Sequence, residues 1–125
     1  MKFQPDSLDG VNTITRHEAE LLWVGSQPHG GSLIVPWTGP VRPWAPADFA
    51  SLTQAHFDEL LQLNPELVIF GSGARLRFPA PALLSGLIAQ RIGVESMDTA
   101  AACRTYNVLV SERRTVVAAL LPEAR

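Results

Sequence analysis

The sequence contains a single cysteine, Cys103, among its 125 residues. One thiol cannot form an internal disulfide, so a disulfide-stabilised secreted scaffold is excluded and a reducing compartment is favoured. No apolar run approaches the ~20 residues that a membrane-spanning helix needs. The first ten residues, MKFQPDSLDG, also lack the apolar segment of a secretory signal. We therefore expect a cytoplasmic protein that is not an integral membrane protein.

The sequence also lacks an excess of charge of either sign, because the net charge is only −2 and no block of basic residues occurs. Nucleic acid and anionic membranes are therefore disfavoured as main partners. His17, His29 and His56 do not have metal-ligand spacing, and a lone cysteine cannot complete a zinc site, so we expect neither metal nor cofactor. No GxSxG motif marks a serine nucleophile. The residues favour a protein without catalytic activity.

The composition, 46% hydrophobic and 18% charged, is typical of a compact globular chain, and its length suits one domain over 1–125. The first half predicts β structure, with strands at 12–16, 21–24 and 32–37. The segment GSQPHGG at 25–31 is predicted as a turn. The proline-rich stretch that follows is predicted as an irregular connection or an edge strand.

The second half alternates helices and strands. Thr53 is expected to cap a helix that ends at the Asn64-Pro65 step. A buried strand at 67–70 precedes a helix over 81–92, whose apolar arc includes Ile88 and whose C-cap is predicted at Gly93. The remaining predicted elements are a strand at 94–97, a helix that is capped by Asp98 or Thr99 and reaches about 111 or 112, and a strand at 115–121. This order predicts an α/β fold.

Polar residues gather on the last predicted helix. At ~100° per residue, Ala102, Cys103, Tyr106, Leu109 and Val110 share an apolar face, with Arg104, Asn107 and Ser111 on its flank. Thr99 and Asn107 lie one turn before and after Cys103, and a helix N-terminus attracts anions. The Gly71-Ser72-Gly73 segment ends a strand, at the edge where α/β sheets bind ligands. The candidate ligand-binding residues are therefore Gly71, Ser72, Gly73, Thr99, Cys103 and Asn107.

Each of these residues also has a structural interpretation. Cys103 fits a packed apolar position better than a reactive thiol, because free cysteine is common in cores. Asn107 fits a ligand contact and a buried amide bonded to backbone equally well. The GSG segment lacks both the lysine of a P-loop and the continuation of a GxGxxG motif, so tight-turn glycines are favoured there.

Two tryptophans in the proline-rich connection, Trp37 and Trp44, are the candidate residues for binding a protein partner. Tryptophan is highly buried on average, so a role in covering the sheet edge is favoured over an exposed anchor, for Trp44 above all.

Five features of the sequence stand out together: GSLIVP at 31–36, Trp44 after a proline-rich turn, VIFGSG at 68–73, MDTAAACRTYNVL at 97–109, and SERRTVVAALLP ending at Pro122. In these features the chain resembles one family, the Mth-type domains. Arg113 stands where relatives frequently have glycine. The resemblance implies a three-layer β+β/α fold with a mixed central sheet, and a pocket near the GSG loop and the start of the MDT helix. It implies no established catalytic activity.

Two functions follow as hypotheses. The first is a non-enzymatic interaction or assembly factor with a protein client; the resemblance, which includes a mitochondrial complex I assembly factor, implies a membrane complex such as respiratory complex I. The alternative is a module, or an enzyme, that binds a small anionic ligand at the GSG loop and the MDT helix start. Only the alternative needs a solvent-connected pocket with converging polar groups.

Overall fold

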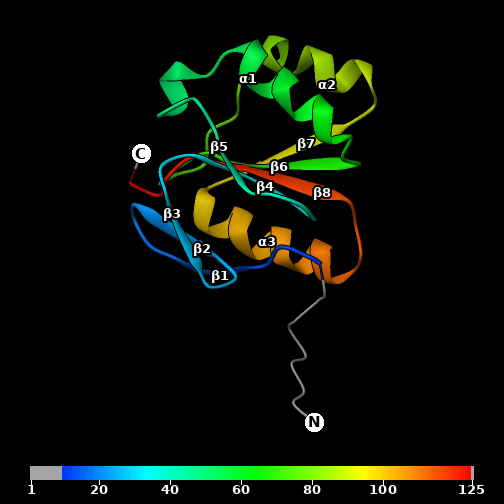
Figure 1. Ribbon diagram of the computed structural model, residues 1–125. Coiled ribbons are helices and arrows are strands. Elements are labelled where there is room, and N and C mark those ends of the chain that lie inside the picture. Colours follow the sequence, from blue (N-terminus) through cyan, green and yellow to red (C-terminus); the bar gives the residue numbers. More distant parts are fainter. Residues whose placement is uncertain (1–9, 125) are drawn as a thin grey trace.

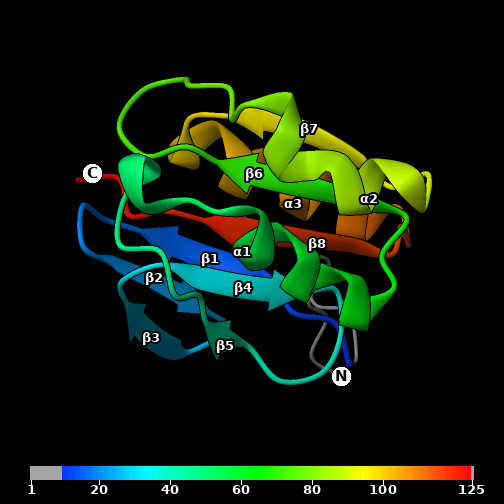
Figure 2. The same ribbon diagram turned by 90° about the horizontal axis from the view of Figure 1, so that it is seen from above.

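The computed structural model describes residues 10–124 and arranges them in three layers (Figure 1). The central layer is a mixed five-stranded sheet of order β5-β4-β8-β6-β7. Its strands are β4 (Leu33–Pro36), β5 (Arg42–Pro43), β6 (Leu67–Gly71), β7 (Gly93–Met97) and β8 (Val116–Leu120). β6 runs parallel to β7 and β8, whereas β4 runs antiparallel to β5 and β8. The order is clearest from above (Figure 2).

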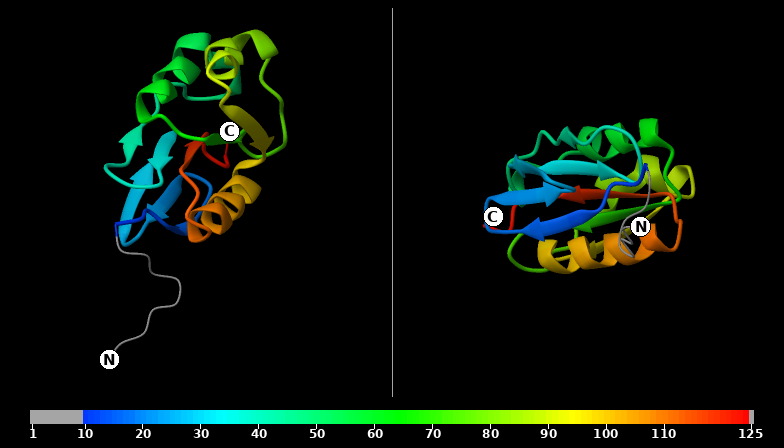
Figure 3. Two further views of the ribbon diagram at one scale, coloured as in Figure 1. Left: turned by 90° about the vertical axis from the view of Figure 1, so that its right-hand side faces the viewer. Right: turned by 60° about the horizontal axis from the view of Figure 1, so that its bottom comes forward.

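One face of this sheet is covered by short helices. They are α1 (Gln54–Asp58), α2 (Ser85–Ala89) and the 3-10 turns Phe49–Ser51, Glu59–Leu63 and Pro81–Leu84. The other face is covered by α3 (Thr99–Ser111) and by an antiparallel sheet of β1 (Ile14–His17), β2 (Leu21–Val24) and β3 (Gln27–Gly30). The side view in Figure 3 separates the layers. The predicted α/β class and the three-layer β+β/α arrangement are confirmed.

The predicted turn at 25–31 is wrong in part. Only Gly25 and Ser26 form the turn, because Val24 pairs directly with Gln27 and residues Gln27–Gly30 form β3. The two-residue loop requires the left-handed backbone of Gly25, which has φ +60°. Pro28 is tolerated because β3 lies at the edge of its sheet, where the missing N–H removes no ladder hydrogen bond.

The segment 81–92 also differs from its prediction. It begins as a 3-10 turn, becomes helical only at Ser85, and leaves Ile88 57% exposed, outside the predicted apolar arc. Gly93 is not the cap but the first residue of β7. The left-handed residue after α2 is Arg91, with φ 60°.

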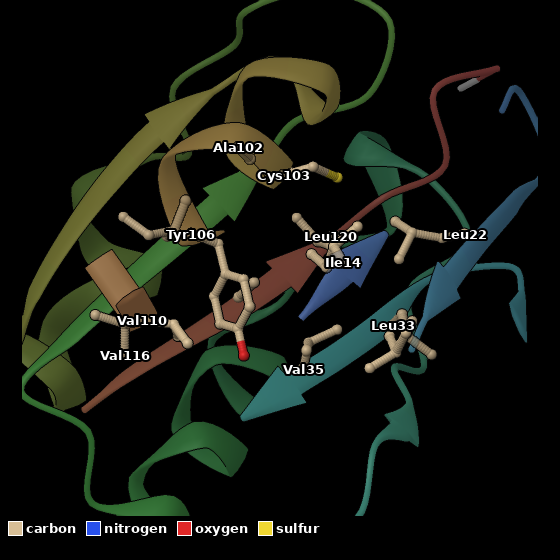
Figure 4. Packing of buried hydrophobic residues seen from close by; sticks show 13 residues of the cluster. Ile14, Leu22, Leu33, Val35, Ala102, Cys103, Tyr106, Val110, Val116 and Leu120 are labelled. Carbon is tan, nitrogen blue, oxygen red and sulfur yellow. The ribbon is translucent and has the colours of Figure 1, made fainter. Parts of the chain in front are cut away.

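The core lies on both faces of the central sheet, which explains the continuous apolar runs in its strands. On one side Val68, Phe70 and Val117 pack beneath α1 and α2 with Trp44. On the other side Ile69, Val116 and Leu120 pack against α3 and the small sheet (Figure 4). The apolar face predicted for α3 is the face that it buries, with Ala102, Cys103, Tyr106 and Val110 buried and Leu109 half-buried.

Candidate functional site

The end of β6 and the start of α3 meet at a closed junction. The hydroxyl of Thr99 accepts a hydrogen bond from the backbone N–H of Gly73 (2.9 Å) and donates one to the carbonyl of Leu121 (2.6 Å). Thr99 is 1% exposed. A Cβ on Gly71 would lie 2.9 Å from the Thr99 hydroxyl and 2.8 Å from the Leu120 side chain, so this glycine is required by close approach. Thr99 therefore joins the ends of β6 and β8 to α3.

Ser72 holds the loop that follows. Its hydroxyl lies 2.7 Å from the carbonyl oxygen of Arg75 and 2.9 Å from that of Met97, and it accepts a hydrogen bond from the N–H of Arg77 at 3.0 Å. Ser72 is 1% exposed, so this hydroxyl points into the protein. A buried hydroxyl with three backbone neighbours stabilises one loop conformation. In this structure Ser72 shapes residues 74–80.

The start of α3 is also capped by its own chain. Asp98 is the N-cap, and its carboxylate accepts a hydrogen bond from the N–H of Ala101 at 2.9 Å. This carboxylate occupies part of the position that an anion would take at the helix N-terminus. The sequence left the cap open between Asp98 and Thr99, and the structure assigns it to Asp98.

Cys103 is packed in the core and is not exposed to solvent. The thiol is 1% exposed and faces Leu22 and Leu120 (Figure 4). Burial, with a smaller contribution from the nearby Glu123 charge, raises the pKa of Cys103 to about 12, which Arg104 only partly offsets. A thiol with this pKa stays protonated at neutral pH and is a poor nucleophile.

Asn107 bonds the backbone of β1. Its side-chain oxygen accepts a hydrogen bond from the N–H of Ile14 (2.9 Å), and its side-chain nitrogen donates to the carbonyl of the same residue (2.7 Å). One amide therefore replaces both contacts that a neighbouring strand would make to Ile14. The sequence left two interpretations of Asn107 open, and the structure shows the one in which the amide bonds backbone.

The six candidate ligand-binding residues are thus only partly brought together. Gly71, Ser72, Gly73 and Thr99 form one junction, Cys103 lies one turn along α3, and Asn107 lies further on, beside β1. Near Thr99, Leu121 and Pro122 the structure leaves a cavity of about 10 Å³, room for about one water molecule. Ligand binding by these residues stays a prediction, and their hydrogen bonds favour the structural interpretation.

The two tryptophans differ in environment. Trp44 is 3% exposed, its ring contacts Phe57 and Phe70 edge-on at centroid distances of 5.6 and 6.1 Å, and its indole N–H donates to the His56 carbonyl at 3.1 Å. The favoured prediction, burial of Trp44, is confirmed. Trp37 is half-buried and lines a groove of about 180 Å³.

The loop at 74–80 exposes apolar side chains that the sequence reasoning missed. Phe78 is 72% exposed and Leu76 is 50% exposed. Arg77 lies over the ring of Phe49 at 5.5 Å, which with Ser72 anchors the loop. The only signal in the sequence is the alternation of arginine with apolar residues in RLRF, which has neither helical nor strand context. Exposed apolar side chains on an ordered loop are typical of a contact surface.

Two further properties of the described residues bear on the kind of site. Within residues 10–124, histidine, cysteine, aspartate and glutamate side chains form no cluster of three or more that could hold a metal ion. In the same residues no helix has both the length and the apolar character needed to cross a membrane.

Comparison with known proteins places the chain in a family. Residues 14–121 match the family described as "Protein of unknown function (DUF498/DUF598)". The chain belongs to this family. A solution structure from Bordetella pertussis, described as a Mth938-like domain, has a TM-score of 0.85 and 29% identity over 98% of this chain and 93% of that one. The resemblance to Mth-type domains is therefore confirmed.

Two relatives have names that bear on function. A protein of Xenopus tropicalis named "NADH dehydrogenase [ubiquinone] 1 alpha subcomplex assembly factor 3" is 29% identical over 94% of this chain and 72% of its own length. A Francisella tularensis protein named "13 kDa major membrane protein" is 33% identical over 55% of this chain and 56% of its own length. The chain thus spans little more than half of some of the curated relatives that it matches.

Proposed function

We propose that this protein is a non-catalytic interaction or assembly factor that binds a client protein. Relatives named as assembly factors of NADH dehydrogenase support this proposal. They also suggest the class of client, a membrane complex such as respiratory complex I. Binding a client requires a contact surface and no reactive group, which agrees with the protonated Cys103 thiol and the hydrogen-bonded Ser72 and Thr99 hydroxyls.

The observation that carries the proposal is the loop at 74–80. Phe78 and Leu76 stand out of an ordered segment, and Arg75 is exposed beside them. The side chain of Phe78 is 72% exposed, so the fold loses most of the stabilisation that burial of its ring would give. Full burial of a large apolar side chain stabilises a protein by about 1.5–3 kcal/mol. Aromatic and arginine side chains are enriched at the centres of protein interfaces. We infer that the client contacts this loop.

The test is capture of a stable client by the tagged protein in cells, followed by mass spectrometry. Phe78→Ser should abolish capture, because it removes the exposed ring without touching the core. Ile88→Ser is the matched control, since Ile88 is 57% exposed on α2 and its loss should leave capture unchanged. Absence of any stable client, or equal capture by both variants, would contradict the proposal.

The alternative, a module or enzyme for a small anionic ligand at the GSG loop, Thr99, Cys103 and Asn107, has weaker support. The hydroxyl and amide groups that would hold the anion already bond backbone. A co-purified small molecule in place of a client would favour it. Cytoplasmic location likewise stays a prediction.

A further inference from the structure

A groove lies at the C-terminal end of α3, the opposite end from the Thr99 junction. Val11, Trp37 and Val110 form its apolar walls, and Arg113, Arg114 and Thr115 complete the lining. Its volume is about 180 Å³. An apolar cavity of about 150 Å³ accommodates a benzene ring, so the groove has room for one aromatic or aliphatic side chain.

The apolar walls are held by a hydrogen-bond network. The N–H of Asn12 donates to the carbonyl of Trp37 at 3.0 Å, and the Asn12 side chain donates to the carbonyls of Pro36 and Gly39, each at 2.8 Å. The Tyr106 hydroxyl lies 2.8 Å from the Asn12 carbonyl oxygen and 3.1 Å from that of Pro36. The segment from Val11 to Asn12 is therefore fixed against Trp37, so the groove is formed before any ligand enters.

The charged side of the groove is built on an unfavourable backbone. Arg113 has φ 65°, in the left-handed region that favours glycine. The hydrogen bonds from Arg114 N–H to the Leu109 carbonyl and from Arg113 N–H to the Val110 carbonyl form a Schellman motif, with Arg113 at the usual glycine position. A side chain kept at a strained position is a reason to look for a function.

The two arginines are not equivalent. The Arg114 guanidinium is paired with Glu66 at 3.1 Å, and the pKa of that carboxyl is lowered chiefly by the Thr115 N–H and further by Arg114. Arg113 is exposed, and its side chain makes no ion pair or hydrogen bond within residues 10–124. The groove thus combines apolar walls with one arginine whose charge is not compensated by a described carboxylate.

We propose that this groove binds a segment of a partner protein in which an aromatic or aliphatic side chain lies next to a carboxylate. The apolar side chain enters between Trp37 and Val110, and the carboxylate pairs with the guanidinium of Arg113, whose planar fork matches a carboxylate. The inference rests on the proposed function, because it takes the occupant to be a client protein. It deepens that function by naming the chemistry of the segment that is recognised.

Two probes of matched shape test the chemistry. Titration of ¹⁵N-labelled protein with 3-phenylpropionate should shift the Trp37 indole and the amides of Val11, Val110 and Arg113. The neutral isostere 3-phenylpropionamide should bind at least about tenfold more weakly, because it cannot form the charge-assisted pair. Shifts that cluster elsewhere, or equal affinity for the two probes, would overturn the proposal.

Arg113→Gly separates binding from folding. Glycine suits the left-handed position, so this variant should melt at or above the wild-type temperature while its affinity for 3-phenylpropionate falls at least about tenfold. Arg91→Gly is the matched control, because Arg91 has φ 60° in the same hydrogen-bond pattern after α2 and does not line the groove. It should gain the same stability and keep wild-type affinity. Unchanged affinity in Arg113→Gly would refute the role of the guanidinium.

A peptide distinguishes a protein segment from a free acid. Acetyl-Ala-Phe-Asp-Ala-amide should give the same shifts and lose affinity in Arg113→Gly. Binding of 3-phenylpropionate without binding of the peptide would make the occupant a small free acid and overturn the proposal. Failure of the proposed function gives a different result, because the protein would then capture no client in cells. If the Arg113→Gly variant still captures a client and the wild-type protein does not bind the peptide, only the groove proposal is refuted.

Discussion

Asn107 offers the sharpest test of how α3 is attached to the small sheet. Its side chain makes two hydrogen bonds to one residue of β1, accepting from the Ile14 N–H at 2.9 Å and donating to the Ile14 carbonyl at 2.7 Å. Asn107→Ala removes both hydrogen bonds at once and leaves the part-buried N–H and carbonyl of Ile14 without these partners. The β1–β2 pairing is irregular between Ile14 and Arg16, so the ladder there has little capacity to compensate.

The expected loss follows from these two bonds. Leaving a buried polar group unsatisfied costs about 1–3 kcal/mol, and partial access of water reduces this cost, so we expect Asn107→Ala to lower the free energy of unfolding by about 2–3 kcal/mol. Urea denaturation followed by circular dichroism measures the total. Hydrogen exchange at the Ile14 amide locates the loss, because that amide should lose protection before the amides of β8.

Two further variants, one that introduces a charge and one control nearby, test the same two hydrogen bonds. Asn107→Asp keeps the acceptor for the Ile14 N–H but sets a carboxylate oxygen against the Ile14 carbonyl, so it should destabilise at least as much as alanine at pH 7. A protonated carboxyl can donate, so this deficit should shrink as the pH falls. Ser111→Ala, one turn further along the same flank and exposed, should change stability by less than about 0.5 kcal/mol. A loss below about 0.5 kcal/mol in Asn107→Ala would refute the reasoning and free Asn107 for a ligand role.

Further outcomes are expected for Cys103, for Trp44 and for the junction at Gly71–Gly73 and Thr99. Folding raises the pKa of the Cys103 thiol from 9.0 to about 12, so the thiol ionises first in the unfolded protein. The contribution of Cys103 to stability is therefore complete below pH 9 and is lost as the pH rises towards 12. For the same reason the native protein should resist iodoacetamide at pH 7. Cys103→Ala should cost only about 1 kcal/mol, and fast alkylation would show a reactive thiol. Trp44→Ala should lower the free energy of unfolding by about 3–5 kcal/mol in urea denaturation. If the variant instead keeps wild-type stability but loses a client, Trp44 is an exposed residue that binds the client. Titration with phosphate should leave the amide chemical shifts of Gly71–Gly73 and Thr99 unchanged. Chemical-shift changes confined to these amides would support the ligand hypothesis.

The regular parts of the fold could be predicted because their signals are local. The apolar runs LVIF and TVVAALL become β6 and β8, which are buried on both faces. Thr53 caps the first helix as expected, although its partner in the capping box is His56, a residue that the usual pattern does not include. In α3 the helical period separated the buried face from the flank correctly.

The predictions that missed have three separate causes. β3 has the sequence QPHG, which has no strand signal of its own and forms a strand because β2 pairs with it. The left-handed residues Arg91 and Arg113 carry no signal, because only glycine and asparagine mark such positions in a sequence. The candidate site residues are not all brought together because the partners of Asn107 lie 93 residues away, in β1.

Three polar residues of α3 serve tertiary attachment, since each of them bonds the backbone of another part of the fold. Thr99 joins α3 to the ends of β6 and β8, Tyr106 holds Asn12 beside Pro36, and Asn107 holds Ile14. Burial also raises the pKa of the Tyr106 phenol, so its hydroxyl stays protonated to a higher pH than that of an exposed tyrosine. Apolar packing alone tolerates sliding of a helix along a sheet, whereas hydrogen bonds to fixed carbonyls do not. The helix is thereby locked in one register between the Ser72-anchored loop and the Trp37 groove. Because both proposed contact surfaces are attached to this one rigid element, a client that touches both would meet them at a constant separation.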